Sequence, residues 1–431
     1  MIRNQERSTE VENTHSSTAE TSVSTGYAVG AIALGFSGNL FSGLVSTLMA
    51  TYLPDSVQDL LGSLSEEDVS FVGSYIGAMY IVGWAVGGIF FGWLADRVGR
   101  IRTLSGALLV VGLATSAASF SPNWLVLVAL RLVTGMGVGA TMVLCAVFAA
   151  EIWGKRVKGR AIAMSILAIG FPIGIISSGL VTWLVTDWRT AFLIGIAPAL
   201  LGLVAPILFS EPPQWRRTPS DEDSSDNGES EWSWLLSPEN KTNFVAGAVI
   251  FGAMSIGIWS TFSWLPTWAQ DLARGSDSAL QVGGTLIALL GMGGIVGSLL
   301  SGPLANLLGR RHTLMVAFAG AGISAVFLFL TNVEFDSIIY VQTAGLALFF
   351  GFSQGILMAY IPELFPTSIR STATGICFNL GRILTALAVF FVGYLVPILG
   401  GYGNALLVFS LTYVFGFAAV VMAPETRNKV L

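Results

Sequence analysis

The sequence predicts an all-α membrane protein with twelve transmembrane helices in two pseudo-symmetric six-helix bundles. The first observation behind this prediction is composition. Of the 431 residues, 53% are hydrophobic and only 11% are charged, whereas ordinary soluble domains carry about 25% charged residues. The second is a set of apolar stretches near 20 residues, the length that crosses a bilayer core of about 30 Å at 1.5 Å per residue. The third is an internal repeat.

The repeat consists of two pairs of similar segments. GWLADRVGR at 92–100 returns as GPLANLLGR at 302–310. AAEIWGKRVKGRA at 149–161 returns as YIPELFPTSIRSTA at 360–373. Both pairs keep their order and spacing, which indicates that one ancestral unit was duplicated.

Apolar runs define the expected spans, six in each half. They lie near 26–53, 69–94, 103–119, 123–150, 162–184, 189–209, 243–268, 281–304, 313–331, 338–361, 373–398 and 402–423.

Changes in composition mark the domain boundaries. Residues 1–25, rich in Ser, Thr and Glu, predict a disordered cytoplasmic tail and not a signal peptide. Bundles at 26–210 and 243–423 flank a polar cytoplasmic linker at 211–242, and 424–431 form a second cytoplasmic tail.

The distribution of Lys and Arg predicts the orientation. Seventeen of these 21 residues fall on the side that carries the repeated segments. Arg189 and Arg274 fall on the other side, and Arg131 and Arg382 fall inside predicted helices. The positive-inside rule therefore predicts a multi-pass protein of the cell (inner) membrane, with both termini and the linker in the cytoplasm.

Several function classes are not expected. The net charge of −5 arises mostly from the tail, the linker and the 53–68 loop, so it predicts no nucleic-acid partner. His15 and His312 lie in the tail and a loop, while Cys145 and Cys377 lie in apolar helix sequence where packing is the default interpretation. We therefore expect no catalytic triad, metal site or cofactor, and no enzyme. The expected partners are a small-molecule substrate and the lipid bilayer, with the chain as a monomer.

The repeated segments place acids and bases at the cytoplasmic rim. Such groups can pair with one another and with helix N-termini in only some conformations, and so latch the cytoplasmic side shut. The alternative is a set of ordinary positive-inside anchors whose surface pairs contribute ~0–1 kcal/mol. The predicted cytoplasmic gate residues are Asp96, Arg97, Arg100, Glu151, Lys158, Arg310, Glu363 and Arg370.

The predicted membrane interior holds two cations. Arg382 is twelve residues past Arg370, which puts it ~18 Å deep on a helix, and Arg131 lies ~12 Å in from the outer side. The acids fall in tails, loops or helix ends. An arginine at mid-membrane costs ~2.5–3.5 kcal/mol on insertion scales, so it needs a partner, and a substrate carboxylate matches its fork. Alternatively, both arginines bond backbone carbonyls or amide side chains and only stiffen the bundle.

Other side chains in the helices are candidates for the same site. Asn379 is three residues before Arg382 and therefore shares its helix face. Gln354 is nine residues before the rim Glu363, ~13 Å deep. Asn39 interrupts the first helix, and Trp259 and Trp264 fall on the seventh, where packing is the alternative role for the aromatic pair.

These motifs resemble those of the major facilitator superfamily. GWLADRVGR resembles the superfamily's loop between helices two and three, and RLVTGMGVGA at 131–140 is similar to its fourth-helix signature. The run ELFPTSIR at 363–370, Gly381-Arg382 and Pro424-Glu425-Thr426 look most like the sugar, aromatic-acid and sialate symporter branch. The resemblance implies a secondary transporter that works by alternating access.

The resemblance leaves substrate and coupling open. Symporters of this branch generally carry an aspartate in the first helix, where this chain has Asn39 and Ser42. A proton could instead travel on the substrate's carboxyl or on a rim acid. We favour uptake of an organic anion, a carboxylate, with protons. The alternatives are a facilitative or proton-coupled sugar or polyol carrier, and a multidrug or metabolite exporter. The segment at 168–179 has Pro172 with scattered glycines but lacks the G-P-x-x-G-G core that efflux antiporters usually show.

Overall fold

Helices make up most of the part of the chain that the structure describes. The computed structural model describes residues 25–62, 65–153, 157–211, 238–276, 278–366 and 370–426. Within those ranges, twelve helical segments are long and apolar enough to cross a membrane, and there are no strands. The predicted fold class is therefore confirmed. Most of the tail predicted at 1–25 and of the linker predicted at 211–242 lies outside the described residues.

The first bundle contributes six spans. They are α2 (Thr25–Thr51), α4 (Glu66–Val98), α5 (Arg100–Ala118), α6 (Trp124–Ile152), α7 (Val157–Leu184) and a broken sixth span made of α8 (Trp188–Phe192), η1 (Leu193–Gly195) and α9 (Ile196–Leu208).

The second bundle repeats this plan. Its spans are α11 (Pro238–Leu272), α12 (Ala279–Leu308), α13 (Arg310–Thr331), α14 (Ile338–Glu363), α15 (Arg370–Leu399) and a broken sixth span made of α16 (Tyr402–Ser410) and α17 (Thr412–Met422).

Polar side chains begin several of these helices. Ser65 accepts a hydrogen bond from the backbone N–H of Asp68, and Asn123 accepts one from Val126. Asp187 caps the broken sixth span in the same way, through the N–H of Thr190. Each cap satisfies a backbone donor that the first helical turn leaves open.

The structure differs from the sequence prediction in four places, one of which is the break between α16 and α17 in the span predicted at 402–423. A short helix, α3 (Leu53–Leu61), occupies part of the predicted 53–68 loop. The span predicted at 189–209 is interrupted by η1. The helix α11 begins at Pro238, five residues before the predicted boundary at 243, where proline suits a first helical turn.

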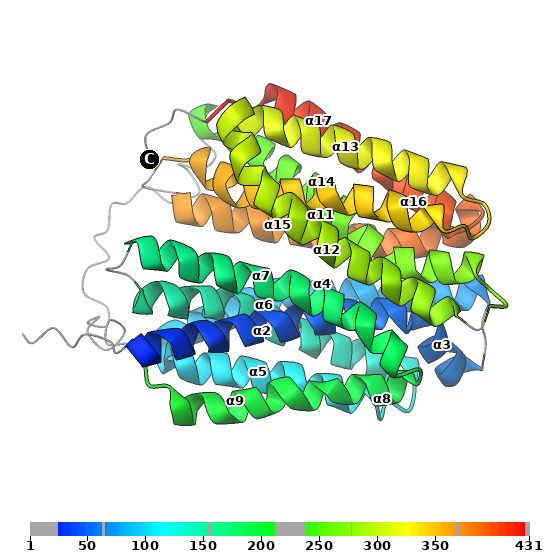
Figure 1. Cartoon of the computed structure of the whole chain (residues 1–431), viewed down its shortest axis with the longest axis horizontal. Helices are drawn as coiled ribbons and strands as arrows, with labels where there is room; N and C mark the ends of the chain where they lie inside the picture. The colour runs from blue at the N-terminus through cyan, green and yellow to red at the C-terminus, as the bar shows by residue number, and fades with distance from the viewer. Residues whose placement is uncertain are drawn as a thin grey trace, which may run out of the picture.

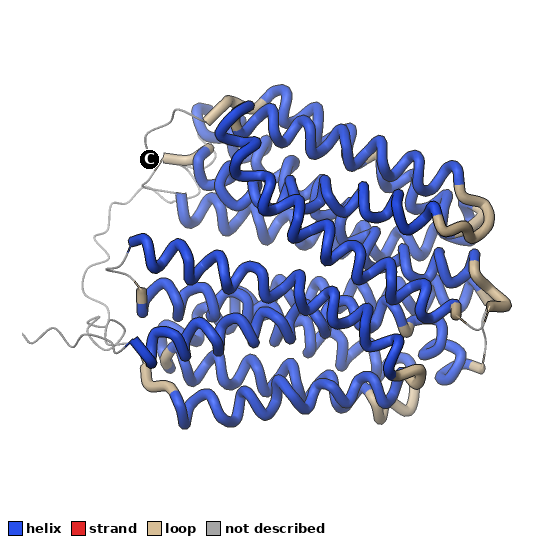
Figure 2. Tube along the Cα trace, in the orientation of Figure 1, coloured by secondary structure: helices blue, strands red, loops and turns tan. Residues whose placement is uncertain are grey.

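The two bundles lie one above the other in the view of Figure 1, and the tube of Figure 2 shows the same two stacks of helices. The end that carries the α4–α5 and α12–α13 junctions, and therefore the repeated 92–100 and 302–310 segments, is called here the repeat end. The opposite end, with α3 and the broken starts of the sixth spans, is called the far end. In Figure 1, α7 and α12 lie close together toward the far end and diverge toward the repeat end.

The bundles are joined at the far end. Gln270 on α11 donates to the backbone oxygen of Thr51 at 2.8 Å, and Gln281 on α12 donates to that of Thr182 at 3.4 Å. The Tyr402 hydroxyl donates to the backbone oxygen of Glu66 at 3.5 Å. These contacts fix the far end in a closed state.

Two glycine contacts allow this closure. On the α7–α12 seam, a Cβ at Gly284 would lie 2.7 Å from the Gly179 oxygen and would overlap Thr182. On the α4–α15 seam, a Cβ at Gly393 would overlap Ser74. The helices can approach this closely only because glycine carries no side chain.

The closed far end should therefore depend on Gly284. We expect Gly284→Val to keep the bundles apart at the far end, because a branched side chain cannot fit beside Thr182. A cysteine introduced at Ser74, which is 1% exposed at the other seam, should then react several-fold faster with a membrane-impermeant maleimide. The native cysteines are both buried.

Gly294→Val is the matched control on the same helix, because a Cβ there would meet nothing within 4 Å. Equal labelling rates in the two valine variants would show that Gly284 does not govern closure.

Candidate functional site

Arg131 lies deep in the first bundle and is only 2% exposed. Its guanidinium faces the Tyr80 ring, with the guanidinium carbon 4.4 Å from the ring centroid. Nη1 donates to the backbone oxygen of Val45 at 3.3 Å, and Nε has no hydrogen-bond partner in the described part of the chain. The Tyr80 hydroxyl in turn lies 2.5 Å from that of Ser46. The described contacts of the Arg131 guanidinium are therefore the Tyr80 ring and one backbone carbonyl, and its Nε–H has no acceptor among the described residues.

Arg382 projects from α15 of the second bundle and is half-buried. It donates to Oδ1 of Asn379 at 3.4 Å, as expected for residues three apart on a helix. Its guanidinium carbon lies 5.8 Å from the Trp84 ring, which belongs to the first bundle. Arg382 thus faces the first bundle across the interface, with the predicted Asn379 beside it on the same helix.

Aromatic rings connect the surroundings of the two arginines. Tyr80 and Trp84 are one turn apart on α4, with centroids 6.1 Å apart. Trp84 packs edge-to-face against Trp259 of α11 at 4.9 Å, and lies 6.0 Å from Phe171 of α7. Rings from both bundles therefore meet beside both guanidinium groups.

A small cavity of about 30 Å³ lies between the bundles on the far-end side of these rings. Its polar lining comes from Ser46, Tyr80 and Arg131 of the first bundle and from Ser263 of the second, and Trp259 also faces it. The remaining lining residues are apolar or glycine: Met49, Ala50, Leu53, Gly73, Ile76, Gly77 and Ile81. In its present state the cavity has room for about one water molecule.

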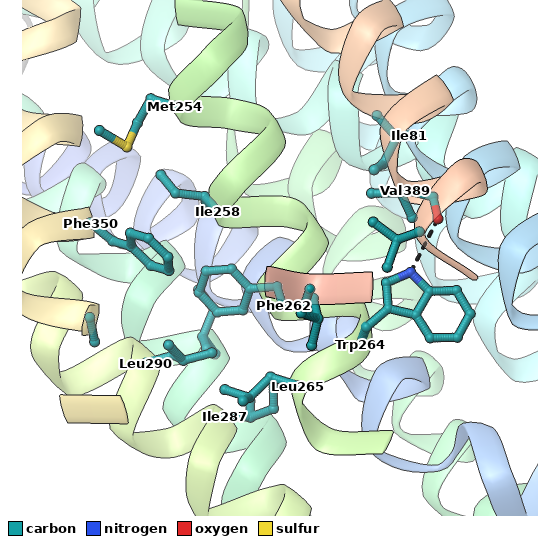
Figure 3. Close-up of a cluster of buried hydrophobic side chains, with 14 of the residues drawn as sticks. Ile81, Met254, Ile258, Phe262, Trp264, Leu265, Ile287, Leu290, Phe350 and Val389 are labelled. Carbon is teal, nitrogen blue, oxygen red and sulfur yellow. Dashed lines mark hydrogen bonds between the residues drawn. The ribbon is translucent and has the colours of Figure 1, made fainter. Parts of the chain in front are cut away.

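Trp264, the other predicted tryptophan, lies at the seam between the bundles and not on this cavity. It is 1% exposed, and its indole N–H donates to the backbone oxygen of Val389 at 3.1 Å (Figure 3). Its ring fills the space beside Gly73 and Gly393. This position makes Trp264 part of the far-end closure, and its predicted contact with substrate stays a prediction.

Two further predicted residues lie in separate helices. Asn39 is buried in α2, where its amide donates to the backbone oxygen of Leu167 at 3.0 Å and its own oxygen has no partner among the described residues. Gln354 is half-buried on α14. Neither shares a described contact with Arg131 or Arg382.

At the repeat end of the first bundle, acids and bases form a network. Arg100 pairs with Asp96 and donates through Nε to Glu151 at 3.0 Å. The Glu211 carboxylate caps α5, accepting from the backbone N–H groups of Arg100 at 2.6 Å and Arg102 at 3.1 Å. An anion at a helix N-terminus is favoured by the unpaired N–H groups and the helix dipole.

The second bundle carries the matching network. Arg310 lies 3.6 Å from Glu363, whose carboxylate also accepts from the Thr426 hydroxyl. Glu425 caps α13 through the backbone N–H groups of Arg310 at 2.9 Å and Arg311 at 3.1 Å. In both networks all of these contacts stay within one half of the chain.

The other predicted gate residues have different surroundings. Arg97 is exposed and stacks on Trp93, 3.9 Å from the ring centroid. Arg370 donates to the backbone oxygen of Phe365 at 3.4 Å. Lys158 lies in the stretch of α7 whose side chains fall outside the described part. Within the described residues, the paired members of the predicted gate are thus Asp96, Arg100, Glu151, Arg310 and Glu363.

Sequence reasoning missed three residues of these sites. Trp84 has a signal, since it is four residues after Tyr80 and shares its helix face. Glu211 and Glu425 have a sequence signal as well. Each lies next to a proline at the end of its half, and the two are separated by nearly the same number of residues as the repeated segments. Their capping contacts cross more than 100 residues of sequence, and no local pattern predicts such contacts.

Two repeated six-helix bundles around a central cavity define the class of protein, a secondary transporter that spans the membrane many times. Residues 27–389 match the Major Facilitator Superfamily, and the chain belongs to this family. Its members are transporters of small molecules and not enzymes, which confirms the function class that the sequence predicted.

Known proteins similar to this chain agree with that placement. The cis,cis-muconate transport protein of Acinetobacter baylyi is 27% identical over 74% of this chain and 77% of its own length. The niacin transporter NiaP of the same organism is 26% identical over 91% of this chain and 93% of its own. The inward-open structure of the xylose transporter XylE from E. coli has a TM-score of 0.71 at 18% identity, over 94% of this chain and 98% of that one.

The two capping acids should contribute equally to stability. We expect Glu211→Gln and Glu425→Gln each to reduce the free energy of unfolding by about 1 kcal/mol, because a neutral amide loses the charge-assisted bonds to the helix N-terminus. Thermal unfolding of the purified protein in detergent measures the effect. Glu334→Gln, in an exposed loop, is the control, and a loss of the same size there would refute a specific capping effect.

Proposed function

We propose that the chain carries a small organic carboxylate across the membrane by alternating access, and that Arg382 binds the carboxylate. The observation that supports this best is the pair of guanidinium groups beside aromatic rings at the junction of the bundles. Arg131 and Arg382 face the rings of Tyr80 and Trp84, and no described Asp or Glu lines the cavity beside Arg131.

The chemistry of these groups fits a flat acid. A guanidinium offers two parallel N–H donors to a carboxylate, which makes a stronger and more directional contact than a point charge does. The edge-to-face pair of Trp84 and Trp259 offers apolar walls for a conjugated or aromatic skeleton. The related proteins named for muconate and niacin, together with a gentisate transporter of Corynebacterium glutamicum that is 24% identical over 72% of this chain, support the same class of substrate.

The orientation that we propose follows the positive-inside rule. The repeat end faces the cytoplasm of a bacterial inner membrane, with both termini and the linker there, and the domain boundaries are those given by the sequence. The closed far end then faces outward, and we propose that the protein opens toward the cytoplasm at the repeat end, where α7 and α12 diverge (Figure 1). The chain works as a monomer in the bilayer.

Proton coupling belongs to the same proposal. The first helix has Asn39 and Ser42 where related symporters carry an acid, so a proton would travel on the substrate's own carboxyl or on a rim acid such as Glu151 or Glu363. Uptake of the acid would then rise as the outer pH falls.

A sugar or polyol carrier is the second candidate, and the oxygen of Asn39 is the observation that favours it. This buried acceptor has no partner among the described residues, and a substrate hydroxyl would supply one. The carboxylate proposal is preferred because a neutral polyol leaves both arginines uncompensated.

The rim networks would form the cytoplasmic gate when the bundles close at the repeat end. In the present state Glu151 and Glu363 pair within their own bundles, which holds each rim rigid. Closure would bring the two rims together, and the acids would then exchange partners.

We expect Glu151→Gln and Glu363→Gln each to change the transport rate and the balance between the two facing states, because the lost charge removes a partner available to only one state. Transport into proteoliposomes, with accessibility of a rim cysteine as the second readout, measures both effects. Unchanged values in both variants would contradict the gate.

The Arg382 series tests the substrate site. A thermal-shift screen against carboxylates and sugars first identifies a ligand. For a carboxylate, Arg382→Gln should weaken binding by about ten- to a hundred-fold, and Arg382→Lys should fall between that variant and the wild type because it keeps the charge but loses the fork. Arg274→Gln, exposed at the far end, is the matched control. Equal affinity across the series would favour the neutral substrate.

A further inference from the structure

We infer that the substrate is a dianion whose two carboxylates bind Arg131 of the first bundle and Arg382 of the second, so that the ligand itself links the bundles. This inference rests on the proposed function and narrows its substrate class.

The two guanidinium groups lie along one row of aromatic rings. Arg131 is 4.4 Å from the Tyr80 ring, the Tyr80 and Trp84 rings are 6.1 Å apart, and Arg382 is 5.8 Å from the Trp84 ring. The distance between the two guanidinium carbons therefore cannot exceed the sum of these three separations. Trp259 connects the surroundings of Arg131 with those of Arg382, since it lines the cavity beside Arg131 and packs against Trp84.

Arg131 lies beside this space and has a donor that no described group satisfies. The side chain is 2% exposed and lines the cavity, yet its Nε has no hydrogen-bond partner in the described part of the chain. A buried N–H of a charged group left without a partner is costly, so a ligand oxygen that accepts from it contributes substantially to binding. The neighbouring hydroxyls of Tyr80 and Ser46 can supply further hydrogen bonds to the same carboxylate.

Charge gives an independent reason for two anionic ends. A monoanion bound at Arg382 leaves the charge of Arg131 without a counter-ion, because its described contacts are a ring and a neutral carbonyl. In a medium of low polarity the second carboxylate is therefore favoured over a methyl group at the same place.

The geometry also limits the length of the ligand. A forked ion pair holds the carboxyl carbon about 4 Å from the guanidinium carbon, so the row of rings leaves room for a diacid of roughly six carbons or fewer. Because one arginine comes from each bundle, only a ligand with two acidic ends draws the bundles together at the repeat end. A matching monoacid binds one bundle and favours closure less.

Two six-carbon acids test this inference with a minimal chemical change. Muconate and sorbate, both all-trans, share the same diene chain and differ only in a second carboxylate in place of a methyl group. Their binding to the full-length protein in nanodiscs is measured by calorimetry at neutral pH, where the acid groups of both are ionised. We expect muconate to bind at least about tenfold more tightly than sorbate.

Variants of the two arginines show which arginine binds each carboxylate of the ligand. In Arg131→Gln the ratio of the two affinities should fall to about one, and Arg131→Lys should give an intermediate ratio. In Arg382→Gln both acids should bind more weakly. Uptake by proteoliposomes adds a second readout, since muconate should be carried faster than sorbate at saturating concentration by the wild type alone.

The outcomes separate the two proposals. Similar affinity of the wild type for both acids, or a muconate preference that survives in Arg131→Gln, overturns the dianion inference and leaves the carboxylate proposal standing. Binding of neither acid, with binding of a sugar instead, overturns the carboxylate proposal and the inference with it. A monodisperse gel-filtration profile for each variant identifies misfolding, and Arg131→Lys then carries the comparison.

Discussion

The arrangement of this protein depends on how it holds two guanidinium groups inside a membrane. Hydrocarbon offers no water to an ion, and an unpaired charge there costs several kcal/mol. The chain meets this constraint with aromatic faces and a carbonyl, through Tyr80 and Val45 for Arg131 and through Trp84 and Asn379 for Arg382. These contacts offset only part of the cost of burying the two charges. An anion that binds between them would offset the rest, which favours its binding.

The rigid parts and the moving parts are built from different contacts. Ion pairs and capping carboxylates, such as Arg100 with Glu151 and Glu425 with the start of α13, tie each bundle together at its repeat end. Contacts between the bundles are instead packed rings such as Trp84 with Trp259, close approaches at glycine and single hydrogen bonds such as Gln270 to Thr51. Breaking contacts of the second kind separates no ion pair, so the bundles can move relative to one another while each keeps its internal structure.

The sequence predicted the fold because the signals for it are local or periodic. Apolar length defines each span, and the repeated segments at 92–100 and 302–310 show the two-fold plan. It also predicted Arg382 with Asn379, which are neighbours on one helix. It could not predict that Arg382 faces Trp84 or that Trp264 belongs to the far-end seam, because those contacts depend on how two bundles meet. The interruptions at η1 and between α16 and α17 were missed for another reason, since their residues are as apolar as the rest of the span.

The Gly-Arg pair that ends each repeated segment has a consequence for how the two halves can diverge. Gly99 and Gly309 have φ angles of +120° and +93°, a conformation that residues with a side chain rarely adopt. A side chain at either position would also collide with the carboxylate of Glu211 or Glu425. Asp96 had no such restriction and its counterpart is Asn306. The charged residue of the two segments could therefore change during divergence, whereas the backbone conformation at this junction requires glycine. The two halves remain similar at the positions where the backbone conformation restricts the residue.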